Sequence, residues 1–99
     1  MAASRKRQFK NELYDQFARL AKAIASGRRL ELIDLLAQGP RSVEALAEET
    51  DQSVANTSQH LQVLRQARLV EASRQGNYIH YRLADDHVLR LWTALRTAG

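Results

Sequence analysis

The spacing of apolar residues changes from helical to extended near Ala67, and this change limits the folds open to the chain. Before it, apolar residues recur every three or four positions, as on one face of an amphipathic helix. The first of these positions are Leu13, Phe17, Leu20 and Ile24. After it, residues 78–83 alternate between two faces, as a β-strand does, and a turn cluster at 75–77 precedes them. We therefore predict a mainly α fold of the α+β kind with a two-stranded β-hairpin.

Helix-start and helix-stop signals divide the helical part. Gly39 and Pro40 end one helix, because glycine accepts a left-handed cap and proline cannot continue the hydrogen-bonded ladder. Ser42 and Ser53 are the predicted N-caps of the next two helices. The prediction is a single domain over residues 1–99 with about five helices, in the order of a winged helix-turn-helix. Its parts are terminal helices at about 9–25 and 85–97, a helix-turn-helix at about 42–66 and a wing at about 69–83.

The stretch SVANTSQHLQVL, residues 53–64, begins with polar side chains and ends with the apolar Leu61, Val63 and Leu64. The second helix of a helix-turn-helix enters the DNA major groove by its N-terminal end, so early positions need hydrogen-bonding groups and later ones anchor to the core. Asn and Gln can bond adenine bidentately, whereas Ser, Thr and His more often hold phosphates. The predicted DNA contacts are Ser53, Asn56, Thr57, Ser58, Gln59 and His60. An ordinary polar helix start is the alternative interpretation.

The predicted hairpin offers a second set of contacts. Arg74, Gln75 and Asn77 at its tip, flanked by Arg82, suit phosphates or the narrow minor groove, since arginine serves in both places. The alternative is an exposed polar turn. Arg28 and Arg29, before the second helix, are further phosphate candidates, and simple solvation is the competing interpretation.

Composition favours an anionic partner and excludes several other functions. Lys and Arg number 15 against 11 Asp and Glu, which gives a net charge of +4. The chain has no cysteine, so disulfides and thiolate metal sites are excluded. No apolar run reaches the roughly 18 residues that span a bilayer, and we expect a cytoplasmic protein without membrane contact. The histidines have no neighbouring nucleophile and carboxylate, so we predict neither an enzyme nor a cofactor.

Residues 17–83 resemble the ArsR/SmtB family of winged-helix repressors. The resemblance rests on Ser53, on the pattern of Ser58, His60, Leu61, Val63 and Leu64, on Leu69 with Val70, and on the wing segment YIHYRL at 78–83. It implies a homodimer, joined through the first and last helices, that binds a dyad-symmetric operator and leaves it when an inducer arrives. The inducer and the operator sequence are not evident from the sequence.

The terminal helices also favour a dimer on their own composition, because they carry more apolar surface than a small core covers. Packing within one chain is the alternative. The predicted dimer contacts are Leu13, Phe17, Leu91, Trp92 and Leu95.

The chain departs from the metal-sensing members of the family that it resembles. Their cysteine pair on the first helix of the helix-turn-helix is replaced here by Ser42, Val43 and Glu44. Asp85 and His87 match half of a zinc site that relatives build between their last helices, but the second half is missing at Ala98. We therefore predict no metal site.

Two further expectations follow. The last-helix stretch LRLWTALRTAG resembles a subset of the family that carries a rhodanese-like sulfurtransferase domain after it, which implies that the native chain continues beyond Gly99.

The leading prediction for function is a dimeric transcriptional repressor that binds double-stranded DNA at an inverted repeat. The alternative is a winged-helix protein-interaction module without an operator, which the salt dependence of DNA binding would separate from a repressor.

Overall fold

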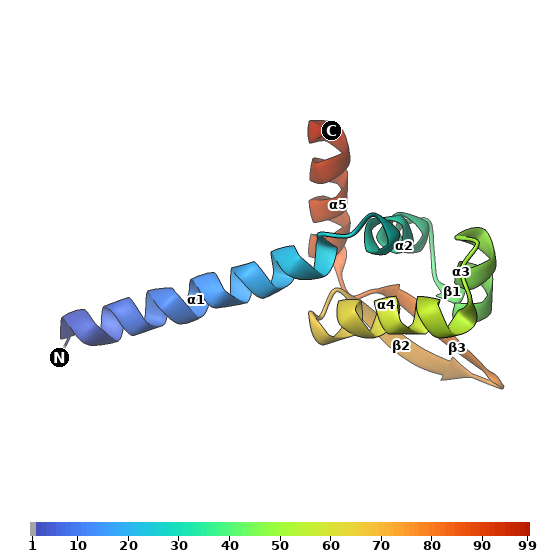
Figure 1. Ribbon diagram of the computed structural model, residues 1–99, viewed down its shortest axis with the longest axis horizontal. Coiled ribbons are helices and arrows are strands. Elements are labelled where there is room, and N and C mark those ends of the chain that lie inside the picture. Colours follow the sequence, from blue (N-terminus) through green and yellow to red (C-terminus); the bar gives the residue numbers. More distant parts are fainter. Residues whose placement is uncertain (1) are drawn as a thin grey trace.

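The fold is a small winged-helix body from which two helices project (Figure 1). It is a computed structural model that describes the backbone of residues 2–99 and the side chains of residues 4–99. The predicted mainly α winged helix-turn-helix is confirmed. The elements are α1 (Ala2–Ile24), α2 (Gly27–Ala37), β1 (Arg41–Ser42), α3 (Val43–Glu49), α4 (Val54–Gln66), β2 (Val70–Gln75), β3 (Tyr78–Leu83) and α5 (Asp86–Ala98).

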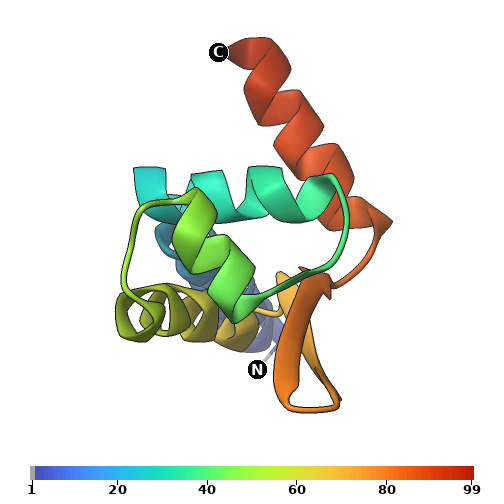
Figure 2. The same ribbon diagram turned by 90° about the vertical axis from the view of Figure 1, so that its right-hand side faces the viewer.

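The core lies where α2, α3 and α4 meet the sheet (Figure 2). Each of these helices is amphipathic and buries its apolar stripe here, at roughly 1.5–3 kcal/mol for each fully buried aliphatic side chain. Val88, at the start of α5, completes the cluster on one side and Ala23, at the end of α1, on another. The other buried members are Leu32, Ile33, Leu36, Val43, Leu46, Leu61, Leu64, Leu69, Val70 and Tyr81.

The two helices of the helix-turn-helix begin at the predicted caps. Ser42 Oγ accepts from the backbone N–H of Ala45 at 3.1 Å, and Ser53 Oγ accepts from that of Asn56 at 3.0 Å. The turn between the helices uses Asp51 at a φ of +55°, where helices usually place glycine. Gln52 N–H then bonds the carbonyl of Ala47 at 2.9 Å, which closes the end of α3 and fixes where α4 starts.

The sheet has three strands in the order β1-β3-β2, one more than the predicted hairpin. The additional strand pairs Arg41 with Tyr81 and is only two residues long, too short for a pattern of alternation. The wing itself is the predicted hairpin, paired from Val70↔Leu83 out to Gln75↔Tyr78. Its tight turn needs Gly76, whose φ of +64° falls where a type II′ turn prefers glycine.

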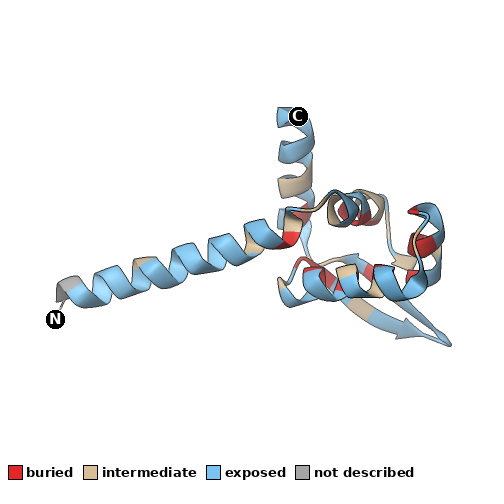
Figure 3. Cartoon of the chain, viewed as in Figure 1, coloured by how far each residue is buried: buried red, intermediate tan, exposed pale blue. Residues whose placement is uncertain are grey.

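Helix α1 is longer than predicted and lies almost entirely outside the core (Figure 3). It begins at Ala2 rather than at about residue 9. Residues 2–8 are mostly good helix formers. They lack the large apolar side chains at helical spacing on which the prediction relied, and so the sequence pattern did not reveal them. Only Ala23 of its described side chains is buried, and Leu20 and Ile24 are half-buried. The helix is therefore held to the body by its last turns alone. No helix in the described part of the chain is long and apolar enough to cross a membrane.

Candidate nucleic-acid interface

The N-terminal half of α4 presents a polar face on the same side of the molecule as the wing. Figures 1 and 2 both place α4 and the hairpin tip on the lower side, opposite the free end of α5. Ser53, Asn56 and Gln59 are exposed there, and Ser58 is half-buried at the edge. Between residues 65 and 82, Glu71 is the sole acidic residue. This side can therefore approach a polyanion with hydrogen-bonding groups in front and positive charge around them.

The burial of Thr57 removes this residue from the predicted set of DNA contacts. Its side chain is 1% exposed, because it shares the inward face of α4 with Leu61 and Leu64 at i, i+4 and i+7. It cannot face a groove from this position. The sequence also placed Val63 among the anchoring residues, but Val63 is 37% exposed.

Two glutamines outside the predicted set belong to this face. Gln52 Oε1 accepts from Asn56 Nδ2 at 2.6 Å and so orients the Asn56 amide across the start of α4. Gln62 is exposed one turn beyond Gln59, on the same face. Helical i, i+3 spacing from Gln59 is the sequence signal that would have found Gln62.

His60 is half-buried and meets Arg29, not solvent alone. Its Nδ1 lies 3.4 Å from Arg29 Nη1. Arginine is always a donor, so Nδ1 acts as the acceptor in this contact. Arg29 itself bonds backbone carbonyls of α1, and so it is not free for DNA phosphates as the sequence suggested. The adjacent Arg28 is exposed.

Three of the four residues predicted for the wing contacts lie at or beside the hairpin turn. Gln75 and Asn77 are exposed, and Arg74 Nε donates to the carbonyl of Gly76 at 3.3 Å, which holds the arginine over the turn. Arg82 does not flank the tip. The register places it opposite Glu71 near the base of the hairpin, and its Nη2 lies 2.7 Å from Glu71 Oε2.

The predicted dimer contacts fall into two groups. Leu13, Phe17 and Leu95 are exposed, with Phe17 at 54%. Leu91 and Trp92 are half-buried, and Trp92 packs against the core. Phe9 and Tyr14, which the prediction did not include, extend the exposed apolar surface of α1, and the rings of Tyr14 and Phe17 meet edge to face at 6.2 Å. A strip of this kind on an isolated helix is typical of a protein–protein contact.

Asp85 serves the start of α5 as a cap. Its Oδ1 accepts from the backbone N–H groups of His87 at 2.9 Å and Val88 at 3.2 Å. The His87 ring lies 3.8 Å from the same oxygen, and both side chains are exposed. Among the described side chains, no three His, Asp or Glu groups converge as metal ligands would.

Known proteins resemble this chain over most of its length. The family model described as "Bacterial regulatory protein, arsR family" matches residues 26–72. The HTH-type transcriptional regulator Rv0324 of Mycobacterium tuberculosis is 47% identical over 90 residues, which are 91% of this chain and 40% of that protein. The biofilm growth-associated repressor of Agrobacterium fabrum is 42% identical over 80 residues, which are 81% of this chain and 68% of that protein.

A solved structure agrees with the fold. The homodimeric winged helix-turn-helix DNA-binding domain (fragment 1–100) of Mb0332 from Mycobacterium bovis matches with a TM-score of 0.86 and 46% identity. The match covers 90% of this chain and 82% of that one. Nothing in these matches bears on a sulfurtransferase domain, which stays a prediction. Because the chain spans only 40% of Rv0324 but 68% of the Agrobacterium repressor, family and fold are what these likenesses establish. The chain belongs to the arsR family of bacterial regulatory proteins.

Proposed function

We propose that this domain is the DNA-binding and dimerising unit of a transcriptional repressor that occupies an inverted-repeat operator in the cytoplasm. The observation that carries the proposal is the exposed polar start of α4 beside the wing, on a body whose longest helix, α1, leaves the apolar side chains of Leu13 and Phe17 exposed. The surface formed by the start of α4 and the wing suits the major groove of DNA, and the apolar surface of α1 suits a second copy of the chain.

Each half of the operator would be read by α4. Gln59 and Asn56 carry amides that can bond adenine bidentately, and Ser53, Ser58 and His60 supply donors for phosphates. Arg74, Gln75 and Asn77 would contact the backbone or the minor groove beside each half-site. Two copies joined through α1 and α5 would place their α4 helices about 34–36 Å apart, one turn of DNA, or a multiple of it.

The test is selection from a randomised duplex library at about physiological salt. A repressor of this kind enriches an inverted repeat, and binding to it weakens steeply as salt rises because several phosphates are neutralised. Retention of random sequences by a folded dimer would contradict the proposal and favour a protein-docking module.

Two variants then separate base reading from phosphate contact. Gln59→Ala is expected to change base preference at one position by about 1–3 kcal/mol, and Gln66→Ala, near the end of α4, is the matched control. Arg74→Ala is expected to weaken all duplexes alike and lower the salt slope by about 1. Equal losses on every sequence for both Gln59→Ala and Arg74→Ala would contradict the assigned roles.

A further inference from the structure

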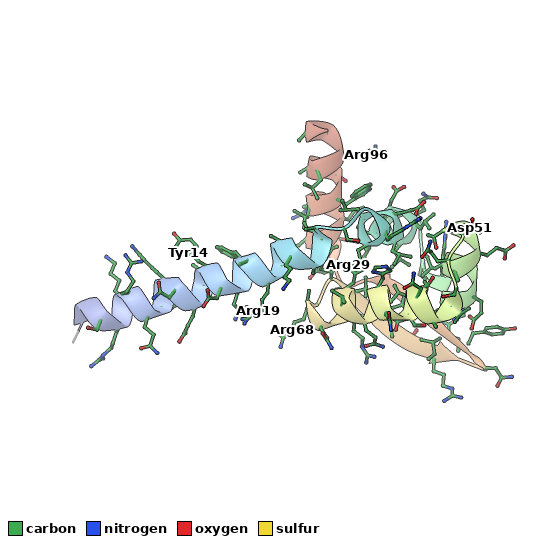
Figure 4. All side chains as sticks on the ribbon, in the orientation of Figure 1. Tyr14, Arg19, Arg29, Asp51, Arg68 and Arg96 are labelled. Carbon is green, nitrogen blue, oxygen red and sulfur yellow. The ribbon has the colours of Figure 1, made fainter. Side chains whose placement is uncertain are left out.

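Arg29 joins three helices through its side chain. Its Nε donates to the carbonyl of Ala23, and its Nη2 donates to the carbonyl of Lys22 at 3.2 Å. Both carbonyls belong to the last turn of α1, where helical carbonyls lack partners within the helix and favour a cation. The third group, Nη1, meets His60 of α4. Arg29 lies on α2, close to where α1 ends (Figure 4). Its own backbone N–H donates to Ser26 Oγ at 3.3 Å.

The other contacts between α1 and the body are apolar and come from its last turns, where Leu20 and Ile24 pack against the core. Ala23 is buried, but further along α1 and α4 diverge and leave a groove lined by Leu13, Phe17 and Val63, among others. A helix of 23 residues is about 34 Å long, so a rotation of about 10° at its base moves its far end by about 6 Å. The direction of α1 relative to α4 therefore depends on the contacts at its last turn, and Arg29 makes the polar ones.

The third contact lies on α4, the proposed recognition helix. His60 accepts from Arg29 with Nδ1, so its Nε2–H is left as a donor on the recognition helix. The set formed by the last carbonyls of α1, Arg29 and His60 thus runs without a break from the proposed dimerisation helix to the proposed DNA surface.

We propose that Arg29 is a positioning residue that sets which half-site spacing the dimer accepts. It touches no DNA. By fixing α1 against α4 in each subunit, it fixes the separation and angle of the two recognition helices once the α1 helices are joined. The inference rests on the proposed function, since it requires a dimer that reads two half-sites.

The experiment measures affinity for a series of duplexes that carry the selected inverted repeat with its central spacer unchanged, shortened or lengthened by one or two base pairs. The wild-type protein is expected to lose tenfold or more for each change of one base pair. Arg29→Ala is expected to lose less than threefold, while its order of preference among bases within a half-site stays the same. Arg28→Ala removes the same charge from an exposed neighbour and is expected to keep the wild-type spacing profile.

Two substitutions of His60 provide a second test if Arg29→Ala does not fold. Asparagine places an oxygen near the position of Nδ1 and keeps an acceptor for Arg29, so His60→Asn should retain the narrow spacing profile. Glutamine places its amide nitrogen near Nε2 and gives no acceptor at the Nδ1 position, so His60→Gln should broaden the profile as Arg29→Ala does. Circular dichroism confirms that each variant is folded at the temperature of measurement.

The outcomes separate this inference from the function on which it rests. Wild-type protein that enriches no inverted repeat contradicts the proposed function. Wild-type protein that binds the repeat, with Arg29→Ala or His60→Gln giving the same spacing profile as Arg28→Ala, overturns the role of Arg29 alone.

Discussion

Replacing Thr57 by valine should stabilise the protein, because the hydroxyl of Thr57 is buried without a partner. Its Oγ1 has no hydrogen bond, and the side chain is 1% exposed between Leu61 and Leu64 on the inner face of α4. A buried polar group left without a partner costs about 1–3 kcal/mol. Valine has the same shape with a methyl group in place of the hydroxyl, and its helix propensity is close to that of threonine.

The expected gain in the free energy of unfolding is about 1 kcal/mol, the lower end of that range, which corresponds to a rise in Tm of about 4–8 °C for a domain of this size. Thermal unfolding followed by circular dichroism measures it, at one fixed protein concentration because association shifts Tm. Thr57→Ser is the matched control. It keeps the hydroxyl and loses the methyl group, and it should lower stability by about 1 kcal/mol.

Two results would refute this reasoning. A lower Tm for Thr57→Val would mean that the hydroxyl has a partner in solution. A loss of operator affinity of tenfold or more, with the fold intact, would mean that Thr57 reaches the DNA as the sequence alone suggested. Retained affinity within about twofold is the expected result.

Three other substitutions test the cap of α4, the proposed dimer contact and the turn of the wing. Ser53→Ala removes the cap that bonds Asn56 N–H and should cost about 1 kcal/mol by chemical denaturation, with an unchanged midpoint as the contrary result. Phe17→Glu puts a charge into the exposed apolar strip and should give a monomer by analytical ultracentrifugation, whereas a dimer of unchanged affinity would exclude this strip from the contact. Gly76→Ala forces an L-residue to a φ of +64° and should lower stability by about 1 kcal/mol, and no change would mean that the turn relaxes.

The sequence was most informative where local chemistry decides the backbone. Ser42 and Ser53 cap helices wherever an open helix start follows, and the alternation at 78–83 with Gly76 before it makes a hairpin in almost any context. Helix ends that lack a glycine were harder to predict from the sequence. Arg68 closes α4 at a φ of +62°, with Leu69 N–H bonded to the carbonyl of Leu64 at 2.9 Å. The burial of Leu64 and Leu69 there favours the turn despite its unfavourable residue.

The sequence predicted which types of residue form the candidate site more accurately than it predicted which of their side chains face outward. Polar character at residues 53–60 is a property of the sequence, but which of these side chains faces outward depends on how α4 rotates against α2 and α3. That rotation buries Thr57 and exposes Val63 and Gln62. A change of less than 100° about the helix axis, one residue's step, separates the two outcomes, and polarity alone does not resolve it.

The sequence by itself determined the order of the helices and of the two wing strands, the family resemblance and the polar character of the start of α4, because capping, periodicity and turn chemistry act over a few residues. The tertiary structure alone decided how far α1 stands from the body, that Arg82 pairs with Glu71 away from the wing tip, and that Arg29 bonds α1 and His60 together. The Arg29–His60 contact joins residues 31 positions apart, and the direction of the Arg29 side chain and of α1 follows from packing of the shared core. The pairing of Arg82 with Glu71 follows from the hairpin register, which the exact position of the turn decides.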